Sequence, residues 1–346
     1  MSGTLTMQTA IARLIGGATL SREEARDVMS VIMEGEATTA QIGSLLTALR
    51  IKGETLEEVT GFAQTMRQKA LHVQTPQTNL LDTCGTGGDG AETFNISTAA
   101  AIVAAAGGIR VAKHGNRAMS SKSGSADVLE ELGVSIGLNA EQAAVCLEKI
   151  GICFMFAQAY HQSMKHVAAP RRELGFRTVF NLLGPLTNPA GADRQVLGVF
   201  DMNKTELIAQ ALGELGLKRA LVVASEDGLD EISISAPTKV SELKDGEINT
   251  YMLTPDELGL RAHSIKDVAG GDAKVNAGII RSILAGDKGA YRDIVLANAG
   301  ACFYVTGHSS TLQEGIKRAS DAIDSGRAAQ KLAQLVQFTG EISHVS

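Results

Sequence analysis

Apolar residues recur at helical spacing along roughly the first 73 residues of the chain. Three segments there open with a capping box, in which Ser or Thr is followed three residues later by Glu or Gln. The pairs are Ser21 with Glu24, Thr38 with Gln41, and Thr55 with Glu58. Because the two side chains of a capping box satisfy the first backbone N–H groups of a helix, this region is predicted to be entirely helical.

The pattern changes after "HVQTPQTN", a polar stretch with a proline at residues 72–79. Short apolar runs then alternate with segments of helical spacing. The runs are "LLDTC" at 80–84, "IRVAKHG" at 109–115, "RALVVAS" at 219–225 and "ISIS" at 232–235. Such alternation indicates an α/β domain with a mostly parallel central sheet flanked by helices. We expect a small helical domain over residues 1–73 and a larger α/β domain over residues 74–346.

A third region, "FNLLGPLTNPAGADRQ" at residues 180–195, interrupts this alternation. Pro185, Pro189 and two glycines fall within eight residues, which we take to exclude regular structure and to indicate a hinge or connector. A connecting segment near residues 163–190 is expected to join the N-terminal helices in space. The following "VLGVF", at 196–200, is predicted to be another strand.

Composition narrows the class of protein. The chain has 346 residues, of which 44% are hydrophobic and 20% charged, as in soluble globular proteins. Its net charge of -6 argues against a broad surface for nucleic acid. The longest apolar run, "ISTAAAIVAAAGGI", is shorter than the roughly 20 residues that cross a membrane. We therefore expect small anions as partners, and neither nucleic acid nor a membrane.

The four cysteines are sparse and form no C-x-x-C pair. They fit a reducing compartment better than a disulfide scaffold. The N-terminus lacks the basic and apolar regions of an export signal. A cytoplasmic location is expected, and Cys84, at the end of a predicted strand, is taken as a small buried residue.

Residues 80–90, "LLDTCGTGGDG", match the glycine spacing of a dinucleotide-binding loop. Backbone N–H groups of such a loop, together with the N-terminus of the helix expected near Ser97 or Thr98, suit a phosphate. Two features argue against a dinucleotide: "AETFNIST" separates the glycines from the helix, and the basic "IRVAKHGNR" stands where a ribose-binding acid is needed. A phosphate-binding loop and a merely structural turn both remain open for this stretch.

A second candidate loop follows in "VAKHGNRAMSSKSGSADVLEELG", residues 111–133. Cations, serines and glycines gather directly before a helix with Asp127 in its first turn, which favours hydrogen bonding to an oxyanion over a solvated basic loop. Two such loops suggest a ligand with phosphates at two ends.

Acidic residues crowd a third stretch, "LVVASEDGLDEISIS", after a predicted strand. Mg²⁺ takes oxygen ligands, usually one or two carboxylates together with substrate phosphates. Asp230 and Glu231 are the favoured pair among Glu226, Asp227, Asp230 and Glu231. An acidic surface turn is the alternative, and the neighbouring phosphate loops favour the metal.

The stretch "HQSMKHVAAPRRELGFRTVFNLLGPLTNP" contains Arg171, Arg172 and Arg177. The planar guanidinium of arginine matches a carboxylate with two hydrogen bonds, so one of the three is a candidate for an acidic substrate. An ordinary surface arginine on a helix is the alternative.

Taken together, "GTGGDGAETFNIST", "KHGNRAMSSKSGSADVLEELG", "RRELGFRTVFNLLGPLTNP" and "LDE" resemble the anthranilate phosphoribosyltransferase family over essentially the whole chain. The third motif distinguishes that family from the related pyrimidine nucleoside phosphorylases. The resemblance implies a helical N-terminal domain joined to an α/β domain and a homodimer formed through the helical part. It also implies phosphoribosyl pyrophosphate (PRPP) as donor, anthranilate as acceptor, and Mg²⁺.

The resemblance also assigns residues to the site. PRPP would be bound by Gly85, Gly88, Asp89, Thr93, Asn95, Ile96, Ser97, Thr98, Lys113, His114, Gly115, Asn116, Arg117, Ala118, Met119, Ser120, Ser121 and Ser125. Mg²⁺ would be held by Ser97, Asp230 and Glu231, and anthranilate by Gly85, Asn116 and Arg171. Lys113, His114, Asp230 and Glu231 are expected to act in catalysis, His114 by positioning.

Three other functions stay open on the sequence alone. They are a pyrimidine nucleoside phosphorylase of the same architecture, a non-catalytic relative that binds nucleic acid, and the dehydrogenase that the glycine spacing suggests. Contact with an enzyme that supplies anthranilate, such as anthranilate synthase, is left undecided by the sequence.

Overall fold

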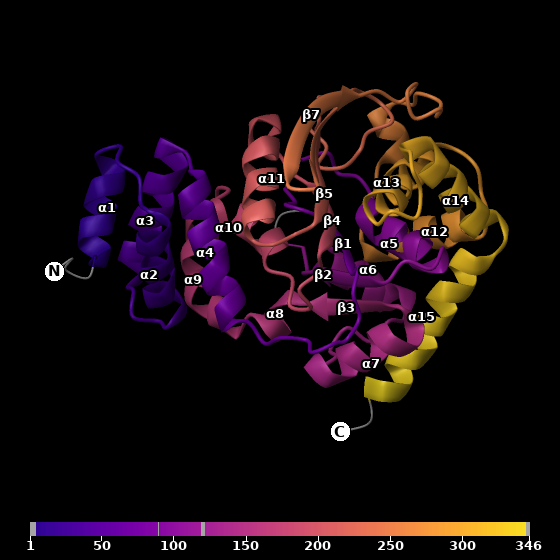
Figure 1. Cartoon of the computed structure of the whole chain (residues 1–346). Helices are drawn as coiled ribbons and strands as arrows, with labels where there is room; N and C mark the ends of the chain where they lie inside the picture. The colour runs from indigo at the N-terminus through magenta and orange to yellow at the C-terminus, as the bar shows by residue number, and fades with distance from the viewer. Residues whose placement is uncertain (1–4, 89, 119–121, 344–346) are drawn as a thin grey trace.

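The computed structural model describes residues 5–88, 90–118 and 122–343. A group of helices occupies one end of the molecule and a sheet covered by helices occupies the other (Figure 1). The N-terminal helices are α1 (Met7–Ile15), α2 (Arg22–Met33), α3 (Thr39–Lys52) and α4 (Leu56–Lys69). The prediction of an entirely helical start to the chain is confirmed for these residues.

All three predicted capping boxes form. The third has an additional role, because Glu58 is fully buried and accepts hydrogen bonds beyond its own helix start. Its carboxylate accepts from the Leu20 N–H at 3.0 Å and pairs with Lys52 at 2.9 Å. One side chain therefore starts α4 and fixes both the turn before α2 and the end of α3. Loss of a partner in such a buried pair is costly, because it strands the remaining charge.

Seven strands form one sheet in the order β3-β2-β1-β4-β5-β6-β7. They are β1 (Leu81–Gly85), β2 (Val111–Gly115), β3 (Ile152–Phe156), β4 (Arg194–Gly198), β5 (Arg219–Ser225), β6 (Thr238–Lys244) and β7 (Glu247–Leu253). β1 to β5 are parallel, and β6 and β7 join them antiparallel. The expected α/β fold with a mostly parallel sheet is confirmed.

The prediction of a strand at residues 232–235 is wrong. The main chain there is hydrogen-bonded to side chains. Asn298 accepts from the Ile232 N–H and donates to the Ile232 carbonyl, both at 3.0 Å. The Ser233 N–H donates to the Thr238 hydroxyl at 3.1 Å. A segment whose backbone groups are used in this way cannot pair with a strand.

Two apolar cores lie on opposite faces of the sheet, because successive side chains of a strand point to opposite sides. On β5, Leu221 and Val223 join one core, and Val222 and Ala224 join the other. The first core includes α5 (Ile96–Ala106) and α13 (Ala290–Val305). The second includes α11 (Thr205–Glu214) and the N-terminal helices, so the helical end continues the core beneath the sheet.

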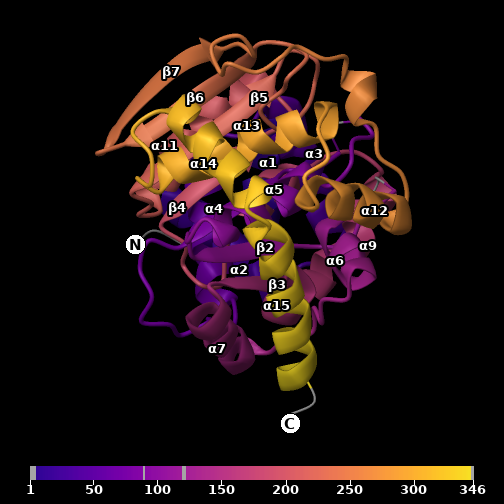
Figure 2. The ribbon, with the colours of Figure 1, turned by 90° about the vertical axis from the view of Figure 1, so that its right-hand side faces the viewer.

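Further helices surround the first core (Figure 2). They are α6 (Ser125–Leu132), α7 (Ala140–Ile150), α12 (Ala273–Leu284), α14 (Leu312–Asp324) and α15 (Arg327–Ser343). No helix among the described residues is both long enough and apolar enough to span a membrane.

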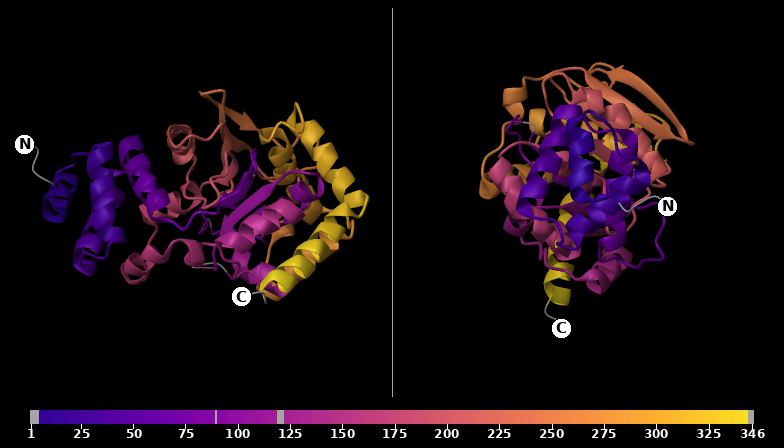
Figure 3. Two further views of the ribbon diagram at one scale, coloured as in Figure 1. Left: turned by 60° about the horizontal axis from the view of Figure 1, so that its bottom comes forward. Right: turned by 90° about the vertical axis from the view of Figure 1, so that its left-hand side faces the viewer.

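The connector contains more regular structure than its prolines suggested. It comprises α8 (Ala157–Tyr160), α9 (Lys165–Leu174), α10 (Val179–Leu183) and a 3-10 turn over Gly184–Leu186, and β4 already begins at Arg194. The expectation that residues 180–195 exclude regular structure is therefore wrong. Pro185 is tolerated because it lies in the first positions of the 3-10 turn, where an N–H has no partner in the turn. α9 packs against α2 and α3, and α10 packs against α3 and α4 (Figure 3).

Candidate functional site

The acidic pair predicted from the sequence lies at the carboxyl ends of β1 and β4. Asp230 and Glu231 are only 8% and 7% exposed. β1 and β4 are adjacent, and the chain leaves them toward opposite sides of the sheet, which is where ligands bind in open α/β sheets. A Cβ atom at Gly85 would overlap the Asp230 carboxylate, and one at Gly198 would overlap the Asp230 main chain. Glycine at both strand ends therefore makes room for Asp230.

The glycine-rich loop after β1 curls over this pair. Gly87 and Gly88 have φ angles of 69° and 71°, values that suit glycine and few other residues. The Gly87 N–H donates to Asp230 Oδ2 at 2.8 Å, and the Ser97 N–H of α5 donates to Glu231 Oε1 at 3.1 Å. The loop and the helix N-terminus expected to face an anion thus face these two carboxylates in this structure.

The second loop, between β2 and α6, is closed by Asp127. Its Oδ2 accepts from the Ala118 N–H at 3.0 Å and from the Gly124 N–H at 2.9 Å. A Cβ at Gly124 would overlap the main chain of Asn116 to Ala118. Arg117 pairs with Asp127 and Glu130, and these carboxylates raise the pKa of its guanidinium further above its ordinary value. Its charge is therefore already balanced at the surface of α6.

The two loops are tied to each other and to α12. The Asn95 amide donates to the Ser123 carbonyl at 3.0 Å, and the Ser123 hydroxyl donates to Asn95 Oδ1 at 3.3 Å. Buried Asn276 of α12 donates to the same Asn95 oxygen at 2.9 Å and accepts from the Gly271 N–H at 2.7 Å. The two loops, which were predicted separately, therefore form one hydrogen-bonded unit.

Lys113 and His114 of β2 are buried beneath these loops. The Lys113 ammonium donates to the Thr83 carbonyl at 2.6 Å and to the Ser97 hydroxyl at 3.4 Å. The His114 ring lies 5.1 Å from the His161 ring, and burial lowers the pKa of His114 to about 3. Its Nε2 atom is buried and finds no hydrogen-bond partner among the described residues. His114 is neutral at neutral pH and cannot serve there as a cationic group.

Of the three candidate arginines, Arg171 of α9 lies over the Phe180 ring, with 5.4 Å between its guanidinium carbon and the ring centroid. Burial lowers the pKa of Arg171 below its ordinary value. Arg177 lies over Phe200 at 4.5 Å, and the Phe200 N–H donates to the Thr86 hydroxyl at 3.1 Å. Arg177 is therefore the one held next to the glycine-rich loop, and Arg172 is exposed.

Other predicted site residues have limits that follow from burial. The side chains of Ile96 and Thr98 are buried in the first turn of α5, so only their main-chain atoms are suited to a ligand. Gly115 ends β2 against Ser125, whose hydroxyl a Cβ there would overlap, and Thr93 forms an isolated bridge with Ala269. Asp89, Met119, Ser120 and Ser121 lie outside the described residues.

Sequence reasoning missed Asp82, Asn188 and Asn276, all of which are buried beneath or beside the loops. The available signal for Asp82 was a charged residue inside an apolar central strand. Burial raises the pKa of Asp82 to about 6. Within the described part of the chain, no three His, Cys, Asp or Glu residues gather as a metal cluster.

Two family models match the chain. A glycosyl transferase family helical bundle domain covers residues 8–70, and a glycosyl transferase family a/b domain covers residues 77–329. The second match alone spans more than half of the chain.

Individual relatives match over nearly their full length. Anthranilate phosphoribosyltransferase of Acetivibrio thermocellus is 55% identical over 333 residues, which is 96% of each chain. The crystal structure of the Thermus thermophilus enzyme has a TM-score of 0.91 and 45% identity, and the match covers 95% of this chain and 99% of that one. The Saccharomyces cerevisiae enzyme, in complex with PRPP and Mg, has a TM-score of 0.90 and 29% identity over 97% of this chain and 98% of its own.

Proposed function

The chain belongs to the anthranilate phosphoribosyltransferase family, and we propose on that premise that its loops after β1 and β2 together bind PRPP. The chain transfers the 5-phosphoribosyl group of PRPP to the amine of anthranilate, giving N-(5-phosphoribosyl)anthranilate and pyrophosphate in L-tryptophan biosynthesis.

The PRPP assignment rests on the hydrogen-bonded union of the two loops. PRPP carries a phosphate at one end and a pyrophosphate at the other, so its site needs two anion-binding loops at a fixed spacing. Asn95, Ser123 and Asn276 hold the loops to each other and to α12. Support for PRPP therefore comes from how the loops are joined, beyond the glycine and serine content of each.

A divalent cation fits the acidic pair at the ends of β1 and β4. Asp230 and Glu231 accept hydrogen bonds from N–H groups of the glycine-rich loop and of α5. An anionic ligand would need the same N–H groups. Carboxylates and a pyrophosphate can share that space only when a cation lies between them. We propose that Asp230, Glu231 and the Ser97 hydroxyl hold Mg²⁺, a hard ion that suits a site with few protein oxygens. When bound, Mg²⁺ neutralises charge on the leaving pyrophosphate.

The chain's own residues have the task of alignment. The amine of anthranilate attacks C1 of the ribosyl group as pyrophosphate departs, so the two substrates must be held in line. An aromatic amine is mostly unprotonated at neutral pH, and neutral His114 is not needed as a strong base. We propose that His114 positions the neighbouring loop, while Lys113 and the loop N–H groups favour the anionic donor.

Arg171 is the proposed partner of the anthranilate carboxylate, together with Gly85 and Asn116. Its charge is partly desolvated, as the lowered pKa reflects, and is stacked on Phe180. A guanidinium in that state gains more from a bidentate carboxylate than one fully in water.

One assay tests this function. Anthranilate fluorescence should fall when PRPP and Mg²⁺ are both added, and should stay constant when either is omitted. Phosphorolysis of thymidine or uridine without that fluorescence loss would instead identify a nucleoside phosphorylase. A DNA or RNA gel shift without turnover would identify the nucleic-acid-binding alternative.

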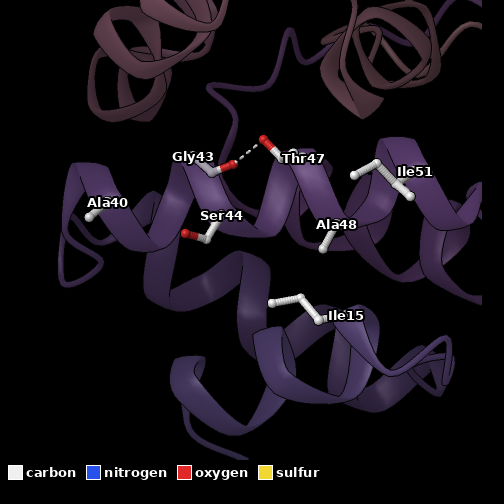
Figure 4. Close-up of a pocket in the computed structure, with 7 residues that line it drawn as sticks. All are labelled: Ile15, Ala40, Gly43, Ser44, Thr47, Ala48 and Ile51. Carbon is white, nitrogen blue, oxygen red and sulfur yellow. Dashed lines mark hydrogen bonds between the residues drawn. The ribbon is translucent and has the colours of Figure 1, made fainter.

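We also propose a homodimer formed through the helical domain. Ile15 of α1 and Ile51 of α3 are 72% and 82% exposed. They line a surface hollow of about 570 Å³ together with the small residues Gly43, Ser44 and Ala48 of α3 (Figure 4). Small residues let a second helix approach closely, and two exposed isoleucines favour burial, so a second copy of this chain is the occupant that we propose.

Two further expectations are also proposed. A domain boundary near residues 73 and 74 is supported by the family-model limits at 70 and 77. A cytoplasmic location is supported by four buried free cysteines.

A further inference from the structure

Strands β1 and β2 are paired along only the first part of their length. β1 pairs with β4 at five successive positions, from Leu81 with Arg194 to Gly85 with Gly198. With β2 it pairs only at Leu81 with Val111, where the Leu81 N–H donates to the Arg110 carbonyl at 2.9 Å. The sheet therefore opens between β1 and β2 before either strand ends.

A continued parallel ladder would join the Thr83 N–H to the Ala112 carbonyl and the His114 N–H to the Thr83 carbonyl. Side chains satisfy three of these four backbone groups instead. Asp82 Oδ1 accepts from the His114 N–H at 3.1 Å. Asn188 Nδ2 donates to the Ala112 carbonyl at 2.8 Å, and Lys113 Nζ donates to the Thr83 carbonyl at 2.6 Å.

The substituting side chains also contact one another. Asn188 Nδ2 donates to Asp82 Oδ2 at 2.8 Å, and Asn188 Oδ1 accepts from the Ala190 N–H at 2.9 Å. All three side chains are buried, and the positive charge of Lys113 partly offsets the rise that burial causes in the pKa of Asp82. Asn188 belongs to the connector, which is thereby fixed to β1 and β2.

The opening between β1 and β2 increases the distance between the strand ends from which the two loops start. Paired strands lie about 4.8 Å apart, whereas side chains inserted between them hold the main chains further apart. The glycine-rich loop leaves the end of β1 and the second loop leaves the end of β2. A sheet built only for stability would continue the ladder, as β2 and β3 do over five positions.

We propose that Asp82, Asn188 and Lys113 form a wedge that sets the spacing of the two PRPP loops, with Asp82 and Asn188 as positioning residues. The inference rests on the proposed PRPP site. Neither Asp82 nor Asn188 needs to touch the substrate, because Asp82 acts through the main chain of His114 and Asn188 through that of Ala112.

The test is a steady-state comparison of Asp82→Asn, Asp82→Ala and Asn188→Ser with the wild-type chain. Asp82→Asn keeps an oxygen that can accept from the His114 N–H, and Asp82→Ala keeps none. We expect the KM for PRPP to rise about tenfold or more, most in Asp82→Ala, with less than a threefold change in the KM for anthranilate. Arg171→Ala should give the opposite split in the same assay.

Thr339→Val is the matched control, because Thr339 is buried and hydrogen-bonded on α15, on the far side of the first core from the N-terminal helices. It should lower the melting temperature with both KM values within twofold of the wild type. The assays are run at a temperature at which circular dichroism shows that every variant is folded. If the Asp82 variants do not fold, Asn188→Ser alone tests the proposed wedge. If the Asp82 and Asn188 variants have lower melting temperatures but a KM for PRPP within twofold of the wild type, the proposed wedge is wrong. Failure of the wild-type chain to turn over would instead refute the proposed function.

Discussion

A Cβ atom at Gly198 would overlap the main-chain carbonyl oxygen of Asp230. Gly198 is the last residue of β4, and Asp230 lies in the loop after β5, so the two meet only because the strands are neighbours. The absence of a side chain at Gly198 is thus what lets the Asp230 carboxylate reach over the end of β1.

Replacing Gly198 with alanine should displace Asp230 and with it the proposed metal site. A shift of about 1 Å in a catalytic constellation can lower the rate about 100-fold, and a loss of that order is expected here. Gly278→Ala is the control, since a Cβ at exposed Gly278 meets nothing within 4 Å. Turnover should be measured at saturating PRPP, anthranilate and Mg²⁺. Near-wild-type turnover in a folded Gly198→Ala protein would show that Asp230 tolerates the shift.

The double variant Asp230→Asn with Glu231→Gln should lose turnover or need far more Mg²⁺ for half-maximal activity. The amides keep the shape of both side chains but remove the negative charges that attract the ion. Glu226→Gln, on an exposed position of the same loop, should leave the Mg²⁺ titration unchanged. If the double variant and the wild type titrate alike, the metal lies elsewhere.

The fold was predictable where local signals agree. The three capping boxes placed the starts of α2, α3 and α4, because each box is contained within four residues. The strand expected at 232–235 failed because its backbone partner, Asn298, lies 66 residues away in the sequence. A short apolar run does not reveal that a distant side chain already uses its backbone groups.

In the candidate site too, some residues could be predicted from the sequence and others could not. The glycines and the acidic pair carry their chemistry in their own sequence, so they could be named as candidates. Asp82 and Asn188 act on backbone groups exposed by an incomplete ladder, and the length of a ladder depends on how two strands meet in space. Asn276, which joins the loops, lies 181 residues from its partner Asn95 and carries no motif.

Arg171→Ala should lose about 1.5 to 3 kcal/mol of interaction with anthranilate, the range for a hydrogen bond to a charged group. That corresponds to a rise of roughly ten- to 150-fold in the KM for anthranilate. Arg171→Lys should have a KM for anthranilate between those of the wild type and Arg171→Ala, because lysine keeps the charge but lacks the planar guanidinium. A defect confined to the KM for PRPP would show that another arginine binds the acceptor, and Arg177, over Phe200 beside the glycine-rich loop, would be the next to test.

His161 should make the protein less stable in acid. Burial lowers the pKa of His161 to about 4 from an ordinary 6.5, and nearby His72 adds to the effect. Between those pH values the unfolded chain binds a proton that the folded chain does not, so the free energy of unfolding falls as the pH falls. The contribution is of order 3 kcal/mol when the pH has dropped through the whole window.

Urea unfolding of the wild type and of His161→Gln at several pH values measures this contribution. Asp82 has the opposite effect in nearly the same range, because its raised pKa of about 6 means that the folded chain binds the extra proton. Both proteins retain Asp82, so the difference between their curves reports His161 together with its effect on neighbouring His114, whose pKa it also lowers. A difference that does not change between pH 7 and pH 4 would rule out the role assigned to His161.

The proposed homodimer predicts that charge at its centre should separate the subunits. Ile15 and Ile51 are the most exposed large apolar side chains in the described part of the chain, and they border the same hollow (Figure 4). In a twofold interface each substitution is present twice, so Ile51→Asp would bring two carboxylates close together in an apolar contact. Sedimentation should give a dimer for the wild type and a monomer for Ile15→Asp with Ile51→Asp. Val275→Asp on α12 is the control, since Val275 is also exposed, at 51%, but lies away from the N-terminal helices and should leave the dimer intact. A wild-type monomer, or a dimer that survives the double substitution, would exclude this face as the interface.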